Sequence, residues 1–285
     1  MVRLTKFIVV MFSLISFHQG LAQKLNKKEA ASLYAKQGMA LCDAEKPNEA
    51  IVALKEALKL DPGNIEYTYE LAYAYNLKKD YNRVLQIMEK LILKKGAFGK
   101  MYHLLGNTYD NLSQPDKAIE TYQLGLKLFP NTGGLYLEIG NSFLKNKNYL
   151  DAARYYEKGI IMDPVYPANY YRVTKLFMSS SEKVWGMLYG EIFILLESNT
   201  KRTAEISKLI YDTYKKQVSI SADGVCTVVF GNIILPDINA PKDTGVNTLP
   251  FLKKVYEPLM RESFSNEKTV DINSMSRART KFIEM

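Results

Sequence analysis

The sequence predicts an all-α chain in which pairs of helices repeat every 34 residues, and three observations support this prediction. Pro62, Pro130 and Pro164 fall in register with a 34-residue period. Apolar and small residues recur in fixed columns of that period, at the spacings of three and four that define one face of a helix. With 47% hydrophobic and 24% charged residues, the composition is that of a globular chain and excludes a disordered or collagen-like one.

Residues 1–22 have the pattern of a secretory signal peptide. Two basic residues precede an apolar run over residues 7–17, and small residues before Gln23 are suited to cleavage after Ala22. The apolar run is shorter than the roughly 20 residues that a membrane-spanning helix requires, so a permanent anchor is the weaker alternative. We therefore expect a mature protein that is periplasmic or secreted.

Five repeats are predicted, beginning at Ala31, Ile65, Gly99, Gly133 and Pro167. Columns four, seven, eight and eleven lie on one face of a first helix, and columns 20, 24 and 27 lie on one face of a second. Small residues at columns eight, 20 and 27 allow two helix backbones to approach closely, while large rings fill the space beside them. Pro47 and Pro115 suit the first turn of the second helix, where a missing N–H is tolerated.

These columns resemble those of tetratricopeptide repeat (TPR) proteins, and the resemblance covers residues 31–198. Leu91 and Gly96 depart from the pattern in the second repeat, and the fifth repeat keeps only its first helix well. A degenerate second helix is expected over residues 183–197. The resemblance implies a right-handed superhelical solenoid of helix pairs, and the N-terminal pattern suggests the secreted bacterial type.

The expected domain organisation has four parts, which are a signal peptide at 1–22, a repeat array at 23–198, a capping helix at 199–218, and a C-terminal segment of unassigned role at 219–285. The array contains repeats near 31–64, 65–98, 99–132, 133–166 and a degenerate one at 167–198. The capping helix has an apolar stripe that would cover the open end of the array.

Three elements are expected within the C-terminal segment. Two apolar runs, 225–230 and 233–235, flank Gly231-Asn232, a pattern compatible with a small β-hairpin. The continuous apolar runs indicate burial on both faces, or a risk of aggregation if they are exposed. A helix over 250–263 would bury Phe251, Val255 and Met260. A last helix would begin at Asp271 or Asn273 and run to Met285.

The resemblance also implies a concave binding groove lined by the first helices. Its columns hold Tyr69, Tyr73, His103, Asn107, Asp110, Asn111, Leu137, Glu138, Asn141, Tyr171, Arg172 and Lys175. In family members, the column of Asn107 and Asn141 grips a peptide backbone, but His103 and Leu137 replace the lysine of a carboxylate clamp. A protein or peptide partner other than a C-terminal acidic peptide is therefore expected. The alternative is a face that is only solvated, or covered by the chain's own C-terminal segment.

Catalysis and cofactors are not predicted. The chain has two His and two Cys, and it lacks a nucleophile elbow, a phosphate-binding glycine loop and zinc-binding or dinucleotide fingerprints. Cys42 and Cys226 are expected to be unpaired core residues. The predicted function is a non-catalytic scaffold with no catalytic residue, cofactor or metal ligand. The alternative is a repeat platform that carries a small ligand-binding or catalytic module within residues 219–285.

The basic charge does not predict nucleic-acid binding. The net charge of +8 falls to +6 when residues 1–22 are removed, because 36 basic residues then face 30 acidic ones. These basic residues are spread over helix surfaces and interleaved with acids. Membrane contact is expected to be peripheral at most, and the sequence leaves the oligomeric state open.

Overall fold

The computed structural model describes residues 26–230 and 252–285, and the chain divides into two compact units, residues 1–130 and 131–285. The predicted signal peptide and the apolar run 233–235 lie outside the described residues. No helix among those described is both long and apolar enough to cross a membrane.

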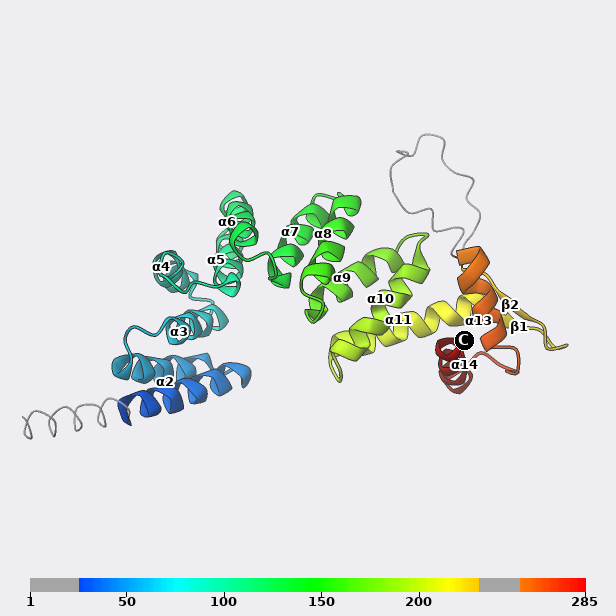
Figure 1. The fold of residues 1–285 in the computed structure, drawn as a ribbon, viewed down its shortest axis with the longest axis horizontal. Coiled ribbons are helices and arrows are strands. Elements are labelled where there is room, and N and C mark those ends of the chain that lie inside the picture. The colour runs from blue at the N-terminus through cyan, green and yellow to red at the C-terminus, as the bar shows by residue number, and fades with distance from the viewer. Residues whose placement is uncertain (1–25, 231–251) are drawn as a thin grey trace, which may run out of the picture. The chain divides into compact units, whose positions relative to one another are not determined.

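The first unit consists of helices that pack as antiparallel neighbours (Figure 1). Residues 26–43 are helical. They are followed by α2 (Pro47–Leu60), α3 (Ile65–Leu77), α4 (Tyr81–Leu91), α5 (Gly99–Asn111) and α6 (Pro115–Leu128). Pro47 and Pro115 stand at the first turn of α2 and α6, as predicted.

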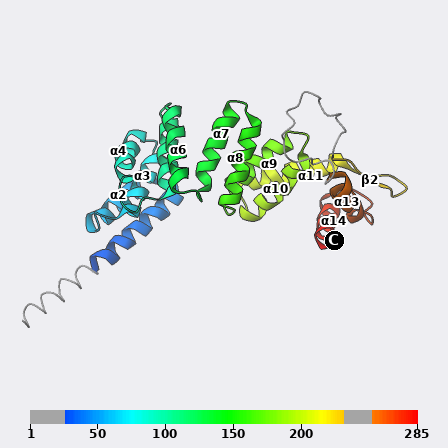
Figure 2. The same cartoon turned by 45° about the horizontal axis from the view of Figure 1, so that its top comes forward.

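The second unit continues the helix pairs and ends in a mixed segment (Figure 2). Its helices are α7 (Gly133–Lys145), α8 (Tyr149–Met162), α9 (Pro167–Met178), α10 (Lys183–Leu196) and α11 (Lys201–Gln217). The mixed segment contains β1 (Val218–Ile220), β2 (Cys226–Val228), a π-helical turn (Leu252–Tyr256), α13 (Glu257–Ser263) and α14 (Ile272–Glu284).

The first helices keep the 34-residue phase along the chain. α3, α5, α7, α9 and α11 begin at Ile65, Gly99, Gly133, Pro167 and Lys201. The helix expected at 199–218 is therefore present, and it starts where the first helix of a sixth repeat would start. The strands and the C-terminal helices follow in place of that repeat's second helix.

The turns inside the repeats show the same period. Glu45, Lys79, Ser113 and Lys147 all adopt the left-handed backbone conformation, with φ between 56° and 63°. Such values are uncommon for residues other than glycine and indicate a turn that the surrounding helix pair imposes. Ser181 occupies the same column in the fifth repeat and does not adopt this conformation. The degenerate helix α10 thus follows a different turn, in which the Ser180 Oγ accepts a hydrogen bond from the Glu182 backbone N–H.

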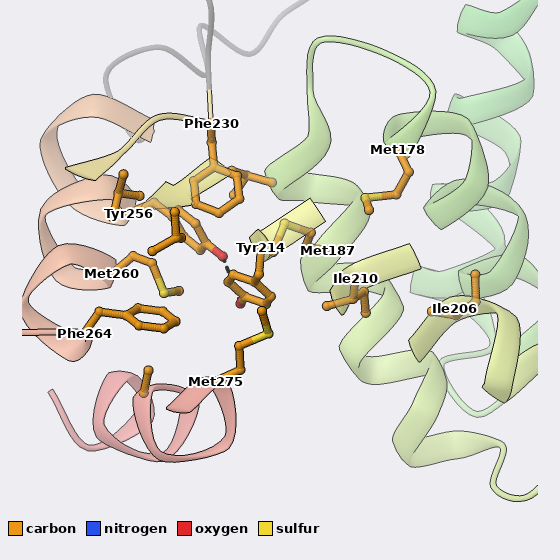
Figure 3. Close-up of a cluster of buried hydrophobic side chains, with 14 of the residues drawn as sticks. Met178, Met187, Ile206, Ile210, Tyr214, Phe230, Tyr256, Met260, Phe264 and Met275 are labelled. Carbon is orange, nitrogen blue, oxygen red and sulfur yellow. Dashed lines mark hydrogen bonds between the residues drawn. The ribbon is translucent and has the colours of Figure 1, made fainter. Parts of the chain in front are cut away.

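The core of the second unit joins α9, α10 and α11 to the C-terminal segment. Figure 3 shows Tyr214 of α11 facing Tyr256, with their hydroxyl oxygens 3.3 Å apart, while Phe264 and Met275 close the cluster from the C-terminal side. These four side chains are at most 5% exposed. Residues 218–230 and 256–278 therefore cover the apolar face of α11.

A small strand pair is present in the C-terminal segment, while the turn expected at Gly231-Asn232 and the run 233–235 lie outside the described residues. β2 pairs with β1 in antiparallel register, Val218 opposite Val228 and Ile220 opposite Cys226, through a turn at residues 221–225. α11 runs directly into β1, and Gly224 supplies a φ of +83° that closes the turn. The expectation of two buried faces fails, because Val225 and Val229 are exposed while Cys226 and Val228 are buried.

The predicted C-terminal helices are partly correct. α14 is present, and Asp271 caps it through a reciprocal capping box with Ser274. Val255, expected in the core, is 42% exposed, whereas Tyr256 and Met260 are buried. The π-helical turn before α13 shifts the helical phase and brings Tyr256 inward instead. Phe251 lies outside the described residues.

Candidate functional site

In the third repeat, a tyrosine of the second helix lies over a glycine of the first helix. A Cβ at Gly106 of α5 would overlap the ring of Tyr122 from α6, so only glycine fits there. The Tyr122 hydroxyl lies 2.6 Å from Asn107 Oδ1 and 3.0 Å from Asp110 Oδ2. Because a hydroxyl carries one hydrogen, Tyr122 can donate fully to only one of these two acceptors.

The Asn107 amide connects this tyrosine to the predicted binding face. Its Nδ2 lies 3.2 Å from His103 Nε2, one turn earlier on α5. Its backbone oxygen accepts a hydrogen bond of 2.7 Å from Asn111 Nδ2. Asn107 and Asp110 thus meet at the Tyr122 hydroxyl, and His103 contacts Asn107. We call these four residues the repeat-3 cluster.

The fourth repeat has the same arrangement 34 residues later. A Cβ at Gly140 of α7 would stand 2.5 Å from Cε1 of Tyr156, which comes from α8. The Tyr156 hydroxyl donates to Asn141 Oδ1 at 2.9 Å, and Asn141 Nδ2 donates to Glu138 Oε2 at 2.9 Å. We call Glu138, Asn141 and Tyr156 the repeat-4 cluster.

Arg172 of α9 lies within electrostatic range of the repeat-4 cluster. Burial raises the pKa of Tyr156 to about 12, while the nearby Arg172 charge acts to lower it and Glu138 acts to raise it. Arg172 is half-buried, and within the described residues its guanidinium makes no hydrogen bond or ion pair. Of these two charges, that of Glu138 directly contacts the Asn141 amide.

The two predicted tyrosines of α3 lie in different surroundings. Tyr69 is half-buried, and its ring packs edge-on against Phe98 with centroids 5.1 Å apart. Tyr73 is 36% exposed and is the more accessible of the two. The pKa of Tyr73 is raised, chiefly by partial burial and further by Cys42, Asp43 and Glu70.

Leu137 does not belong to an open binding face. It is 8% exposed and packs in a cluster with Ala152, Tyr156 and Val173. Because α9 packs against both α7 and α8, its Val173 closes the space that column five of the fourth repeat was expected to leave open. We therefore remove Leu137 from the predicted site.

The fifth-repeat positions are engaged by the chain itself. The Tyr171 hydroxyl donates to Glu205 Oε2 and Lys175 Nζ donates to Glu205 Oε1, both at 2.7 Å. The Arg202 guanidinium lies over the Tyr171 ring, 5.2 Å from its centroid. Both hydrogen bonds lower the pKa of Glu205, and the one from Lys175 has the larger effect. Tyr171 and Lys175 thus contact α11, which precedes the C-terminal segment that was expected as the alternative cover of this face.

Tyr122 and Tyr156 are the residues that the site prediction missed. The sequence assigns them to column 24 as packing residues, which their rings are. Their hydroxyl contacts could have been suspected from one signal, since only the third and fourth repeats combine Gly-Asn at columns eight and nine with Tyr at column 24. Among the described residues, no group of three or more His, Cys, Asp or Glu side chains is placed to hold a metal ion.

Two stretches of the chain, residues 41–105 and 99–132, match the tetratricopeptide repeat family. Tetratricopeptide repeat protein 21B of Mus musculus is 30% identical over 114 residues, which is 40% of this chain and 9% of that protein. The human protein 21B is 30% identical over 112 residues, which is 39% of this chain and 8% of that protein. The chain therefore spans less than a tenth of the length of these curated relatives.

Two solved structures share the fold at low sequence identity. A thermophilic TPR protein of Thermus thermophilus is 14% identical with a TM-score of 0.55, covering 64% of this chain and 99% of that one. PilF of Pseudomonas aeruginosa is 16% identical with a TM-score of 0.51, covering 67% and 93%. With the helix pairs and the 34-residue phase, these matches show that the chain contains tetratricopeptide repeats and has the fold of a tetratricopeptide-repeat solenoid.

Proposed function

We propose that the protein is a non-catalytic scaffold that works outside the cytoplasm and binds an extended segment of a protein partner through its first helices. Proteins with tetratricopeptide repeats generally bind protein or peptide partners. The proposal rests on one observation of this chain. Asn107 and Asn141 occur at the same column of successive repeats, and each is held by a tyrosine hydroxyl.

The two asparagines keep hydrogen-bonding capacity for a partner. Each Nδ2 carries two hydrogens, and one faces His103 in the repeat-3 cluster or Glu138 in the repeat-4 cluster. Both side chains are half-buried, so a hydrogen bond to a partner would be partly shielded from water. Since both side chains are already held in place, binding costs little additional conformational entropy.

Nucleic acid is not part of the proposal, because many basic side chains are already paired with acids. Lys59 pairs with Glu56, Lys208 with Asp212, Arg277 with Glu267, and Lys281 with Glu262. Basic residues that are paired or interleaved with acids in this way do not favour binding to a phosphate backbone.

The setting outside the cytoplasm rests on residues 1–22 alone. Expression of the full chain in its native cell, followed by N-terminal sequencing of the mature protein, tests it. We expect a mature N-terminus at Gln23 and recovery from an extracytoplasmic fraction. A cytoplasmic protein that retains Met1 would contradict this part of the proposal.

Cross-linking in the native envelope tests the binding function. The variant Tyr73→Ala/Asn107→Ala/Asn141→Ala should lose most of the partner that the wild type captures. The matched control is Gln123→Ala/Lys127→Ala, which changes two exposed residues of α6 and should capture as the wild type does. Equal capture by the triple variant, at unchanged helical content, would contradict the proposed binding face.

The alternative function, a separate module within residues 219–285, is less well supported. Its buried residues share one core with α9–α11, including the pair Tyr214–Tyr256. Removal of residues 219–285 should therefore expose Ile210 and Tyr214 and abolish the cooperative unfolding of the second unit, as measured by circular dichroism. A stable, cooperative truncated protein would favour an independent module.

A further inference from the structure

We propose that Glu138 and Tyr156 are positioning residues that fix the Asn141 amide so that the fourth repeat recognises a hydrogen-bond acceptor of its partner, such as a backbone carbonyl. This inference rests on the proposed function, because it specifies the chemistry that the same face recognises. It assigns the two residues a role beyond packing.

The geometry fixes the amide at both ends. The carboxylate of Glu138 can only accept hydrogen bonds, so it selects the Nδ2 end of Asn141, 2.9 Å away. The Tyr156 hydroxyl then donates to Oδ1, also at 2.9 Å. A flip of the amide would set Oδ1 against the carboxylate, and this repulsion disfavours the flipped state.

The tyrosine is itself held in place by its surroundings. Tyr156 is fully buried, and its ring lies over Gly140, where a Cβ would stand 2.5 Å from Cε1. The hydroxyl therefore cannot follow the amide if Asn141 rotates. The second Nδ2 hydrogen of Asn141 is left as the donor for a partner oxygen.

The Glu138 carboxylate lies 2.9 Å from the Asn141 amide nitrogen, which favours a neutral partner acceptor over an anionic one. The Glu138 charge acts to raise the pKa of Tyr156, and the Arg172 charge acts to lower it. A partner carboxylate would approach Arg172 favourably but would be repelled by Glu138, whereas a peptide carbonyl is favoured by the amide donor without that repulsion. One backbone carbonyl of the partner segment is therefore inferred to face Asn141.

Nuclear magnetic resonance of the unliganded full chain tests the orientation without any partner. In the wild type, the Asn141 Hδ2 protons should show a stronger nuclear Overhauser effect to Glu138 Hγ than to Tyr156 Hε. Glu138→Gln, which can donate as well as accept, should weaken this preference and broaden or double the Hδ2 signals. Tyr156→Phe should do the same while the ring and its contact with Gly140 remain.

The control is Tyr136→Phe, which removes a hydroxyl from another buried tyrosine of the same unit. Among the described residues, the Tyr136 hydroxyl has no hydrogen-bond partner. Tyr136→Phe should leave the Asn141 signals as they are in the wild type. A wild-type spectrum with the stronger effect to Tyr156 Hε, or spectra unchanged in both Glu138→Gln and Tyr156→Phe, would overturn the proposal.

A second measurement tests the recognition step, with a synthetic peptide of the segment that the cross-linking experiment identifies. Each peptide bond is replaced in turn by an ester, which removes an N–H donor and weakens the carbonyl acceptor. An ester at the position facing Asn141 should lower the affinity for the wild type. The same ester should lower the affinity for Asn141→Ala by a factor at least three times smaller. An equal loss in both proteins would overturn acceptor recognition, even if binding itself is confirmed.

Discussion

The third and fourth repeats share one packing arrangement and differ in the group that faces the asparagine amide. In both, a column-24 tyrosine lies over a glycine and its hydroxyl reaches the next residue, Asn107 or Asn141. The other end of the amide meets an imidazole in the third repeat and a carboxylate in the fourth. A carboxylate only accepts, whereas an imidazole nitrogen can accept or donate.

This difference separates two roles of the repeat sequence. The residues that recur, Gly and Tyr, determine how the two helices of a repeat pack. The group that faces the asparagine Nδ2 varies, being His103 from column five in the third repeat and Glu138 from column six in the fourth. Asp110 adds a second acceptor for Tyr122 that the fourth repeat lacks, since Leu144 occupies the same column. We therefore expect the two repeats to respond alike to packing changes and differently to changes at the amide.

The largest expected effect comes from filling the glycine positions. Gly106→Ala and Gly140→Ala should each lower the free energy of unfolding by about 1–3 kcal/mol, because the new Cβ overlaps a buried tyrosine ring. The overlap is more severe at Gly106, so its loss should be the larger one. Urea denaturation measures both, with Gly63→Ala as control because no atom lies within 4 Å of its Cβ position. Equal stability of the three variants would refute the shared packing.

A smaller effect is expected from removing only the hydroxyls. Tyr122→Phe and Tyr156→Phe should each lower the free energy of unfolding by about 1 kcal/mol, because each loses a hydrogen bond to an asparagine while the ring remains. Thermal unfolding compares both variants with Tyr136→Phe, whose free energy of unfolding should fall by less. If Tyr136→Phe is the most destabilised of the three, the tyrosine–asparagine contacts contribute little to stability.

The turns should respond equally in the two repeats. Ser113 and Lys147 both have a φ of 58°, a conformation that glycine adopts with less strain. Ser113→Gly and Lys147→Gly should therefore raise the free energy of unfolding by up to about 1 kcal/mol, measured by chemical denaturation. Ser181→Gly, at the fifth-repeat position without this conformation, should instead be neutral or destabilising. A gain at Ser181 that matches the other two would contradict the turn assignment.

The smallest effect concerns the fifth repeat, where the face is engaged by α11. The pKa of Glu205 is lowered, so its stabilising contribution is present at neutral pH and is lost as the pH falls through that lowered value. Both partners are about 45% exposed, and an exposed pair contributes roughly 0.2–1 kcal/mol. The difference in the free energy of unfolding between the wild type and Glu205→Gln should be smaller in acid than at pH 7. A constant difference would argue against the ion pair.

Much of the fold could be predicted because the repeat pattern is local. A fixed 34-residue spacing places the first helices from Ile65 to Pro167 without any knowledge of long-range contacts, and an apolar stripe predicts the helix at 199–218, which is α11. The features that were not predicted depend on local shifts that periodicity does not show. A π-helical turn moved Tyr256 into the core in place of Val255, and the continuation of α11 into β1 provided β2 with a partner upstream of the expected turn.

The candidate site was predictable in its columns and less so in its contacts. Asn107 and Asn141 were located by their shared column, but the tyrosines that hold them belong to the second helices and had been assigned to packing alone. Leu137 and Tyr171 were placed on the face because a column fixes the helix side. Whether a neighbouring helix covers that side depends on tertiary packing, as Val173 and Glu205 show.

The affinity of the cross-linked partner segment for the single variants tests the central claim most directly. Isothermal titration of the wild type, Asn107→Ala and Asn141→Ala should show about tenfold weaker binding for each variant, which is the loss expected for one partly shielded hydrogen bond of about 1.4 kcal/mol. Gln123→Ala should bind as the wild type does. Wild-type affinity in both asparagine variants would contradict the claim that these amides hold the partner.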